Sequence, residues 1–187
     1  IRVEAAHNLE NLINQSLTEL DLPQARFSIR IEYLDSYEAS GMDHVEFYFS
    51  PNKGENPKPL VKIASGGEIS RVMLAFKSVL NQYDNKTTII FDEIDTGVGG
   101  ETIINLSKKI ARLANISQVI CVTHSAALAT FADTHFFIFK RFQNKRTVTK
   151  VLKLSHEERI NEISRMLGGA EQIDTVTEHA KEMLKFA

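Results

Sequence analysis

Three short groups of residues in this sequence have side chains suited to phosphate and water chemistry: Ser65-Gly66-Gly67-Glu68, the pair Asp92-Glu93, and His124. If a helix begins at the first group, the Ser65 hydroxyl, the free backbone N–H groups and the helix dipole would attract an anion such as phosphate. Two glycines in a first helical turn cost about 1 kcal/mol each relative to alanine, which favours a need for close backbone approach. The alternative is an ordinary helix start, because Ser65 and Glu68 have the spacing of a capping box.

The acidic pair follows residues 87–91, an apolar run that is typical of a strand. In open α/β sheets, ligands bind beyond the carboxyl ends of the strands. There, Asp92 could hold the water shell of Mg²⁺, and Glu93 could orient or deprotonate an attacking water. The alternative is a solvated pair of loop acids.

His124 comes one residue after a second apolar run, 118–123, and is therefore expected near the same sheet edge. Its imidazole could donate a hydrogen bond to a phosphate oxygen, and the alternative is a structural histidine. The six histidines of the chain show no HExxH spacing, so we expect no metal site built on them. Ser125 and Asp133 do not predict a hydrolase triad with His124, because the sequence has no G-x-S-x-G and neighbouring residues on an extended backbone point apart.

The elements that must position these groups predict an α/β fold with a parallel βαβ core. From residue 65 to 83 apolar residues recur with the spacing of a helix that buries one face. The runs 87–91 and 118–123 are continuous, as expected of strands covered on both faces, and 101–114 is the predicted helix between them.

Residues 3–20 form a predicted amphipathic helix, which is either the end of a coiled-coil arm or a surface helix, and residues 21–187 are predicted to form one lobe. Segments 27–31 and 45–49 alternate with period two, which predicts strands with one buried face. The segment 51–59, rich in Pro, Gly, Asn and Lys, predicts a surface loop.

Towards the end of the chain, segments 135–140 and 147–154 predict an added antiparallel hairpin with a turn at Gln143-Asn144. Residues 156–167 and 175–185 predict two helices, with Gly168-Gly169 as a C-terminal cap between them. The hairpin region 140–153 has six basic residues and no acidic one, namely Lys140, Arg141, Lys145, Arg146, Lys150 and Lys153. With Phe142 among them, this could be a nucleic-acid surface. We favour the other interpretation, a hairpin with its phenylalanines in the core and its cations in water.

The composition limits the class of protein. The chain has 187 residues, 43% of them hydrophobic, and a formal net charge of −2, which suits one sizeable core and excludes a disordered or globally basic chain. Cys121 is the single cysteine, so an intrachain disulfide and a multi-cysteine zinc site are excluded. No apolar run approaches the roughly 18–20 residues of a membrane span. Residues 1–10 lack the pattern of a signal peptide, so we expect an intracellular domain.

The order and spacing of the three groups resemble the C-terminal lobe of an ABC-type ATPase head. The stretches 62–71 and 91–98 and the tail 158–169 are similar to the RecN family of SMC-like DNA repair ATPases, with a likeness that begins at about residue 41. After His124, the family usually has a Leu-Pro-Gln-like turn, whereas this chain has Ser125-Ala126-Ala127.

The resemblance implies a role for each candidate residue. Asp92 would support Mg²⁺ through water, Glu93 would polarise the hydrolytic water, and His124 would sense the γ-phosphate of ATP. The signature residues would contact ATP held by a second head, and Asp95 would lie at the seam between the two heads. The signature residues are Ser65, Gly66, Gly67 and Glu68.

The resemblance also implies ATP hydrolysis at a head–head interface during recombinational double-strand-break repair. The expected cofactors are ATP and Mg²⁺. The expected partners are a second copy of the head in an ATP-dependent homodimer, an N-terminal P-loop lobe of the same protein, and DNA, with a cytoplasmic, nucleoid-associated location and no membrane. The sequence contains no G-x-x-x-x-G-K-[ST], so we expect an isolated fragment of a head that is inactive alone. The alternatives are a head fragment of another ABC- or SMC-type ATPase and a non-enzymatic nucleic-acid module.

Overall fold

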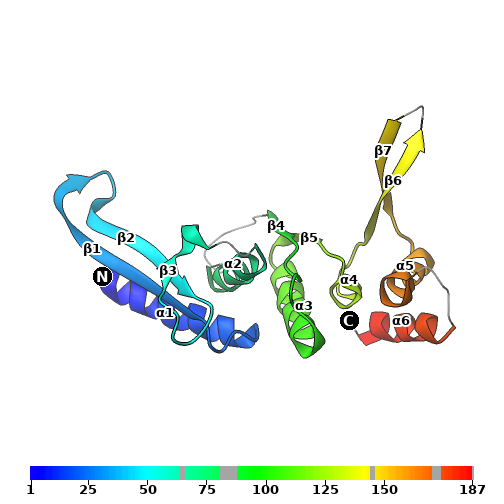
Figure 1. Ribbon diagram of the computed structural model, residues 1–187, viewed down its shortest axis with the longest axis horizontal. Coiled ribbons are helices and arrows are strands. Elements are labelled where there is room, and N and C mark those ends of the chain that lie inside the picture. Colours follow the sequence, from blue (N-terminus) through cyan, green and yellow to red (C-terminus); the bar gives the residue numbers. More distant parts are fainter. Residues whose placement is uncertain (64–65, 81–87, 144–145, 170–173, 187) are drawn as a thin grey trace. The chain divides into compact units, whose positions relative to one another are not determined.

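The computed structural model describes residues 1–63, 66–80, 88–143, 146–169 and 174–186, and these form two compact units, Ile1–Val122 and Thr123–Ala187 (Figure 1). In the described ranges no helix is both long and apolar enough to cross a membrane. The α/β class predicted from the sequence is confirmed, with a parallel strand pair in the first unit and an antiparallel hairpin in the second.

The first unit opens with α1 (Arg2–Glu19), followed by the antiparallel strands β1 (Arg26–Glu38) and β2 (Gly41–Ser50). A short strand β3 (Lys58–Pro59) pairs with β2 and precedes the 3₁₀ turn η1 (Leu60–Lys62). The predicted helix and both predicted strands are confirmed, and the strands extend well beyond the alternating segments. Their period-two pattern was too short to show this extension, since residues 32–38 are mostly polar.

Side chains on α1 satisfy the main chain of β1. The Asn14 amide accepts a hydrogen bond from the Phe27 N–H and donates one to the Phe27 carbonyl, both at 2.9 Å. Glu10 Oε1 accepts a hydrogen bond from the Ile29 N–H at 2.6 Å. An unpaired strand edge invites association with another chain. The polar face of α1 thus covers part of that edge, while its apolar residues Ile13 and Leu17 are fully buried.

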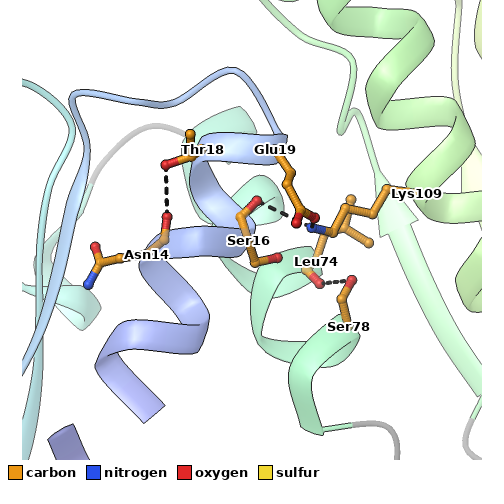
Figure 2. Close-up of polar contacts among 7 residues, drawn as sticks. All are labelled: Asn14, Ser16, Thr18, Glu19, Leu74, Ser78 and Lys109. Atoms are coloured by element: carbon orange, nitrogen blue, oxygen red, sulfur yellow. Dashed lines mark hydrogen bonds and ion pairs between the residues drawn. The ribbon is translucent and has the colours of Figure 1, made fainter. Parts of the chain in front are cut away.

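The C-terminal end of α1 is tied to the helix α3 (Gly100–Ala114) by one lysine, as Figure 2 shows. Lys109 Nζ lies 2.6 Å from Glu19 Oε2 and donates a hydrogen bond to the Ser16 carbonyl oxygen at 3.3 Å. A cation is stabilised at a helix C-terminus by the free carbonyls and the helix dipole. Lys109 therefore links α3 to the C-terminal end of α1.

The βαβ core of the first unit consists of β4 (Thr88–Asp92), α3 and β5 (Gln118–Val122), preceded by α2 (Gly66–Leu80). The two strands are parallel and in register from Thr88 opposite Gln118 to Asp92 opposite Val122. The parallel strand–helix–strand unit predicted from the sequence is confirmed.

The expectation that both strands are covered on both faces is wrong for the described chain. Ile89 and Phe91 are buried, but Ile90 is 66% exposed and its neighbour on β5, Ile120, is 45% exposed. Side chains alternate between faces along a strand, so Ile90 lies on the face opposite Ile89 and Phe91. Within the described ranges, that second face stays open. The apolar run therefore indicates a strand with two apolar faces, of which the described residues bury one.

The described part of the second unit contains three helices, α4 (Ala126–Thr130), α5 (His156–Gly168) and α6 (Asp174–Phe186). Its buried cluster contains Ala126, Ala129, Ile163 and Ala180. The Ser155 hydroxyl and the Glu158 carboxylate form a capping box at the start of α5, and Gly169, with φ of 80°, ends that helix as predicted. The five-residue helix α4 was not predicted, because it is shorter than two turns and offers no readable period.

Arg159 of α5 links α5 to the end of α4. Its guanidinium donates hydrogen bonds to the carbonyl oxygens of Ala129, Thr130 and Ala132, with 2.9 Å to Thr130. These carbonyls lie at the C-terminus of α4, where backbone acceptors lack helical partners. His135 is half-buried beside this group. Burial and the charge of Arg159 lower the pKa of His135 from its ordinary value.

The strands β6 (Phe136–Gln143) and β7 (Arg146–Lys153) form the predicted hairpin, which extends away from the described helices of its unit (Figure 1). The turn was predicted at Gln143-Asn144, but Gln143 is still part of β6 and pairs with Arg146, and residues 144–145 lie outside the described residues. Every residue of β7 is exposed. The predicted burial of the phenylalanines is wrong for Phe136, which is 55% exposed, and for Phe142, which is 73% exposed. Phe137 and Phe139 are half-buried and stack at 5.5 Å between ring centroids. A two-stranded ribbon has two faces, and the helices of this unit leave most of both uncovered.

Candidate functional site

The start of α2 confirms that a glycine there serves close backbone approach. A Cβ added to Gly67 would lie 2.9 Å from the Thr96 carbonyl oxygen, a distance that real Cβ atoms essentially never show. The first turn of α2 is therefore packed against the backbone of the segment after β4. Ser65 and the side chain of Glu68 lie outside the described residues, so the capping box predicted there stays a prediction. The helix itself begins at Gly66.

The acidic pair stands where the sequence placed it, at the carboxyl end of β4. Asp92 is the last residue of β4 and Glu93 follows it, and both side chains are exposed. The Glu93 N–H donates a hydrogen bond to the Val122 carbonyl oxygen at 3.2 Å, which anchors the start of the turn to β5. Both carboxylates are therefore free to reach water or a ligand at the sheet edge.

Glu93 has a backbone conformation that favours glycine. Its φ is 51°, in the left-handed region, where a residue with a Cβ is disfavoured by roughly 1–2 kcal/mol. Such strain persists only where the surrounding structure over-determines it, and it clusters at functional sites. The strained residue is thus the one whose carboxylate, by the family resemblance, polarises the hydrolytic water. It supports the interpretation of Asp92-Glu93 as more than a solvated loop pair.

The turn after β4, residues 93–98, is held by its own hydrogen bonds and by buried side chains. The Thr96 N–H donates to the Glu93 carbonyl at 3.0 Å, and the Val98 N–H donates to the Asp95 carbonyl at 3.1 Å. Ile94 is fully buried and Asp95 is 3% exposed. The side chains of Ile94 and Asp95 thus lie inside the first unit, whereas those of Asp92 and Glu93 face outward.

The carboxylate of Asp95 also acts on Cys121 of β5. Burial, with the negative charge of Asp95 as the smaller cause, raises the pKa of the Cys121 thiol to about 11. A thiol with so high a pKa is not a nucleophile near neutral pH, because the thiolate is the reactive form. The single cysteine of the sequence is therefore not a candidate nucleophile.

His124 is exposed and belongs to the second unit, two residues beyond the end of β5. After His124 this chain has Ser125-Ala126-Ala127 where the family usually has a Leu-Pro-Gln-like turn, and the structure shows what Ser125 does there. The Ser125 hydroxyl caps α4 by accepting a hydrogen bond from the Leu128 N–H at 3.4 Å, and the Ser125 N–H donates to Thr123 Oγ1 at 2.9 Å. Ser125 is thus a helix cap.

The structure brings together Gly67, Asp92, Glu93 and Asp95, all of the first unit, at one end of the parallel strand pair. It also reveals a participant that the sequence did not identify. Arg71 Nη1 donates a hydrogen bond to the Thr96 carbonyl oxygen at 3.2 Å, beside the notch left by Gly67. The acceptor is a backbone carbonyl, which every residue has, so the sequence could not indicate this contact. The only available signal was that Arg71 lies one helical turn after Gly67 on the same face.

The residues at this sheet edge fit a magnesium ion held mainly by water and phosphate. Among the described residues, no three His, Cys, Asp or Glu side chains cluster as a metal cage. Mg²⁺ at nucleotide sites usually keeps several waters and takes one or two carboxylates plus the phosphates of the nucleotide. Asp92, exposed at the end of β4, offers such a carboxylate.

Comparison with known proteins found close relatives by sequence, although no protein-family model matches the chain. It is 41% identical over 191 residues to the DNA repair protein RecN of Halalkalibacterium halodurans, a match that covers all of this chain and 34% of the relative. It is 48% identical over 147 residues to RecN of Bacillus subtilis, covering 79% of this chain and 26% of the relative. The RecN of Vibrio cholerae is 38% identical over 98% of this chain and 33% of the relative. The chain thus spans about a third of the length of these relatives.

Solved structures with a similar fold are heads of SMC proteins. One, from work on ATP-driven dimerization and DNA-stimulated activation of SMC ATPases, has a TM-score of 0.54 at 20% identity, covering 92% of this chain and 96% of that chain. The Smc head domain with a coiled coil and joint from Pyrococcus yayanosii has a TM-score of 0.57 at 21% identity, covering 88% of this chain and 29% of that chain. On these likenesses, the chain belongs to the RecN family of DNA repair proteins and has the fold of part of an SMC-type head.

Proposed function

We propose that this chain supplies the signature helix, the acidic strand end and the switch histidine of an SMC-type ATPase head. The whole protein binds and hydrolyses ATP between two heads during recombinational double-strand-break repair, at the nucleoid. The observation that carries the proposal is the turn after β4. Two exposed carboxylates stand at a strand end there, one in strained left-handed geometry, with the glycine notch of α2 packed against the same turn.

In this proposal the two neighbouring carboxylates have separate roles. Asp92 holds the water shell of Mg²⁺, which neutralises phosphate charge when bound. Glu93 orients the hydrolytic water and accepts its proton, a task that typically contributes about 10²–10⁴ in rate. His124, from the second unit, donates a hydrogen bond to the γ-phosphate.

The start of α2 contacts ATP held by a second copy of the head. Ser65, Gly66, Gly67 and Glu68 provide backbone N–H groups and a hydroxyl at a helix N-terminus, which suits a phosphate. Asp95, which belongs to the same turn as Glu93, lies at this seam. Formation of this site needs an N-terminal P-loop lobe of the same protein and the second head, so the 187-residue chain alone does not hydrolyse ATP.

Glu93→Gln in the full-length protein tests the proposal. The amide keeps the size of the side chain but cannot accept a proton, so we expect normal ATP binding, hydrolysis slowed by about 10²–10⁴, and an ATP-held dimer. Phosphate release and size-exclusion chromatography with ATP measure these effects. Glu101→Gln, an exposed glutamate in the first turn of α3, is the matched control. Asp92→Asn should weaken Mg²⁺-dependent nucleotide binding as well as hydrolysis. Wild-type turnover by Glu93→Gln would refute the assigned roles.

A second candidate function rests on the exposure of the hairpin. All its described basic residues, Lys140, Arg141, Arg146, Lys150 and Lys153, are exposed, so they could contact the phosphates of DNA. The double charge reversal of Arg146 and Lys150 to glutamate would then weaken DNA binding and flatten its salt dependence while ATP hydrolysis persists. An unchanged salt dependence would count against a DNA-binding hairpin.

A further inference from the structure

The contact between α2 and the turn after β4 is narrow and rests on one missing side chain. A Cβ on Gly67 would lie 2.9 Å from the Thr96 carbonyl oxygen and 3.4 Å from Arg71 Nη1. The notch at Gly67 therefore admits both the carbonyl of the turn and the guanidinium that binds it. Any larger residue at this position would push at least one of them away.

Arg71 is the side chain that spans this contact. It lies four residues after Gly67, and residues spaced by four lie on the same helix face. Its Nη1 donates a hydrogen bond to the Thr96 carbonyl oxygen at 3.2 Å. A guanidinium is a rigid planar fork of donors, so its hydrogen bonds fix direction as well as distance.

Thr96 lies at a point of the turn where a hydrogen bond to its carbonyl restrains the backbone near Glu93. It lies three residues after Glu93, and its N–H already donates to the Glu93 carbonyl at 3.0 Å. Gly97 follows with φ of 71°, which completes a turn whose two ends both have left-handed geometry. The Thr96 carbonyl belongs to the next peptide plane, shared with Gly97, so Arg71 and the Glu93 carbonyl hold Thr96 from its two sides. Restraint of Thr96 in turn restrains the hydrogen bond that closes the turn on the strained residue Glu93.

We propose that Arg71 is a positioning residue for Glu93, acting through the Thr96 carbonyl. This inference rests on the proposed function of Glu93. Arg71 transmits displacements of the first turn of α2 to the catalytic turn, so that the carboxylate is aligned when phosphate binds at α2. Removal of the guanidinium therefore loosens the turn but removes no side chain that contacts the nucleotide.

Two measurements on the full-length protein test the role of Arg71. Hydrogen exchange at the Thr96 and Val98 amides reports the turn without nucleotide, and steady-state ATP hydrolysis reports catalysis. For Arg71→Ala we expect exchange at least tenfold faster and kcat lower by about 10- to 100-fold, with KM changed less than twofold. Arg71→Lys keeps a cationic hydrogen-bond donor without the planar fork and should restore part of both. The control, Arg112→Ala, removes an exposed guanidinium from the last turn of α3 and should change neither.

The outcomes separate this inference from the proposed function. If the wild-type protein does not hydrolyse ATP, the proposed function fails, while the exchange rates still show whether Arg71 holds the turn. If Arg71→Ala exchanges or turns over like Arg112→Ala, or if KM changes as much as kcat, the positioning role is overturned.

A second pair of variants applies if Arg71→Ala does not fold. Gly67→Ala pushes a methyl group against the Thr96 carbonyl, whereas Gly99→Ala adds one where no atom of the described residues lies within 4 Å. Faster exchange at Thr96 and Val98 in Gly67→Ala alone supports the link between α2 and the turn. Equal exchange in the two variants would overturn it.

Discussion

The turn after β4 and the hairpin β6–β7 carry equally suggestive residue types in very different structural settings. The turn has two exposed carboxylates on a backbone fixed by hydrogen bonds, by fully buried Ile94 and by Arg71. The hairpin has exposed cations and phenylalanines on two strands that are hydrogen-bonded to each other, and its β7 residues are all exposed. Chemistry needs fixed geometry, whereas contact with a charged polymer needs only charge and reach. The comparison therefore favours the turn as the catalytic element.

The largest stability contrast uses one isoleucine from each region. Ile94→Ala removes a fully buried side chain from the turn, and we expect the free energy of unfolding to fall by about 2–5 kcal/mol. Ile138→Ala removes a side chain that is 58% exposed on the hairpin, so a change within about 0.5 kcal/mol is expected. Urea unfolding of the chain followed by circular dichroism measures both. Similar losses for the two variants would show that the hairpin is as well packed as the turn.

The turn also predicts an unreactive cysteine. With its pKa raised to about 11, Cys121 should react with iodoacetamide at pH 8 roughly a hundredfold more slowly than an exposed peptide thiol. Asp95→Asn removes the charge that contributes to the shift, so alkylation should accelerate. The rate is read by mass spectrometry. Asp133→Asn is the control and should leave the rate unchanged, because Asp133 is not among the causes of the raised Cys121 pKa. Rapid labelling of the wild-type chain would contradict the burial of this thiol.

A smaller effect is expected below neutral pH in the second unit, near the base of the hairpin. The pKa of His135 is lowered in the folded state, so the unfolded chain takes up a proton first as the pH falls through about 6.5. The stability of this unit should therefore be fully present above that pH and decline below it. Urea midpoints at pH 7 and pH 5.5 test this. His135→Gln should lack the decline and His156→Gln, an exposed histidine on α5, should keep it.

Periodicity predicted most of the fold, because the amphipathic faces of α2, α3 and α5 are long enough to show a period. Periodicity could not predict that Ile90 is exposed in the described structure. An apolar side chain indicates that its face is suited to burial, but it does not show which part of a protein covers that face. Helix α4 has only five residues, which is too short for a period to predict it. The spacing of the candidate groups located Gly67, Asp92 and Glu93, and a glycine at a helix start correctly indicated close backbone approach. The left-handed φ of Glu93 and the hydrogen bond from Arg71 to the Thr96 carbonyl could not be predicted, because both depend on the backbone and not on the type of the residue.

The strained turn is tested most directly by single-turnover phosphate release from full-length Glu93→Gly and Glu93→Ala, measured beside their unfolding midpoints. Both variants lack the carboxylate, so we expect both to lose hydrolysis by at least about 10². Glycine tolerates the φ of 51° and alanine does not, so Glu93→Gly should be the more stable by about 1 kcal/mol. Phosphate release at the wild-type rate by either variant, or equal stability of the two, would contradict a turn strained to hold a catalytic carboxylate.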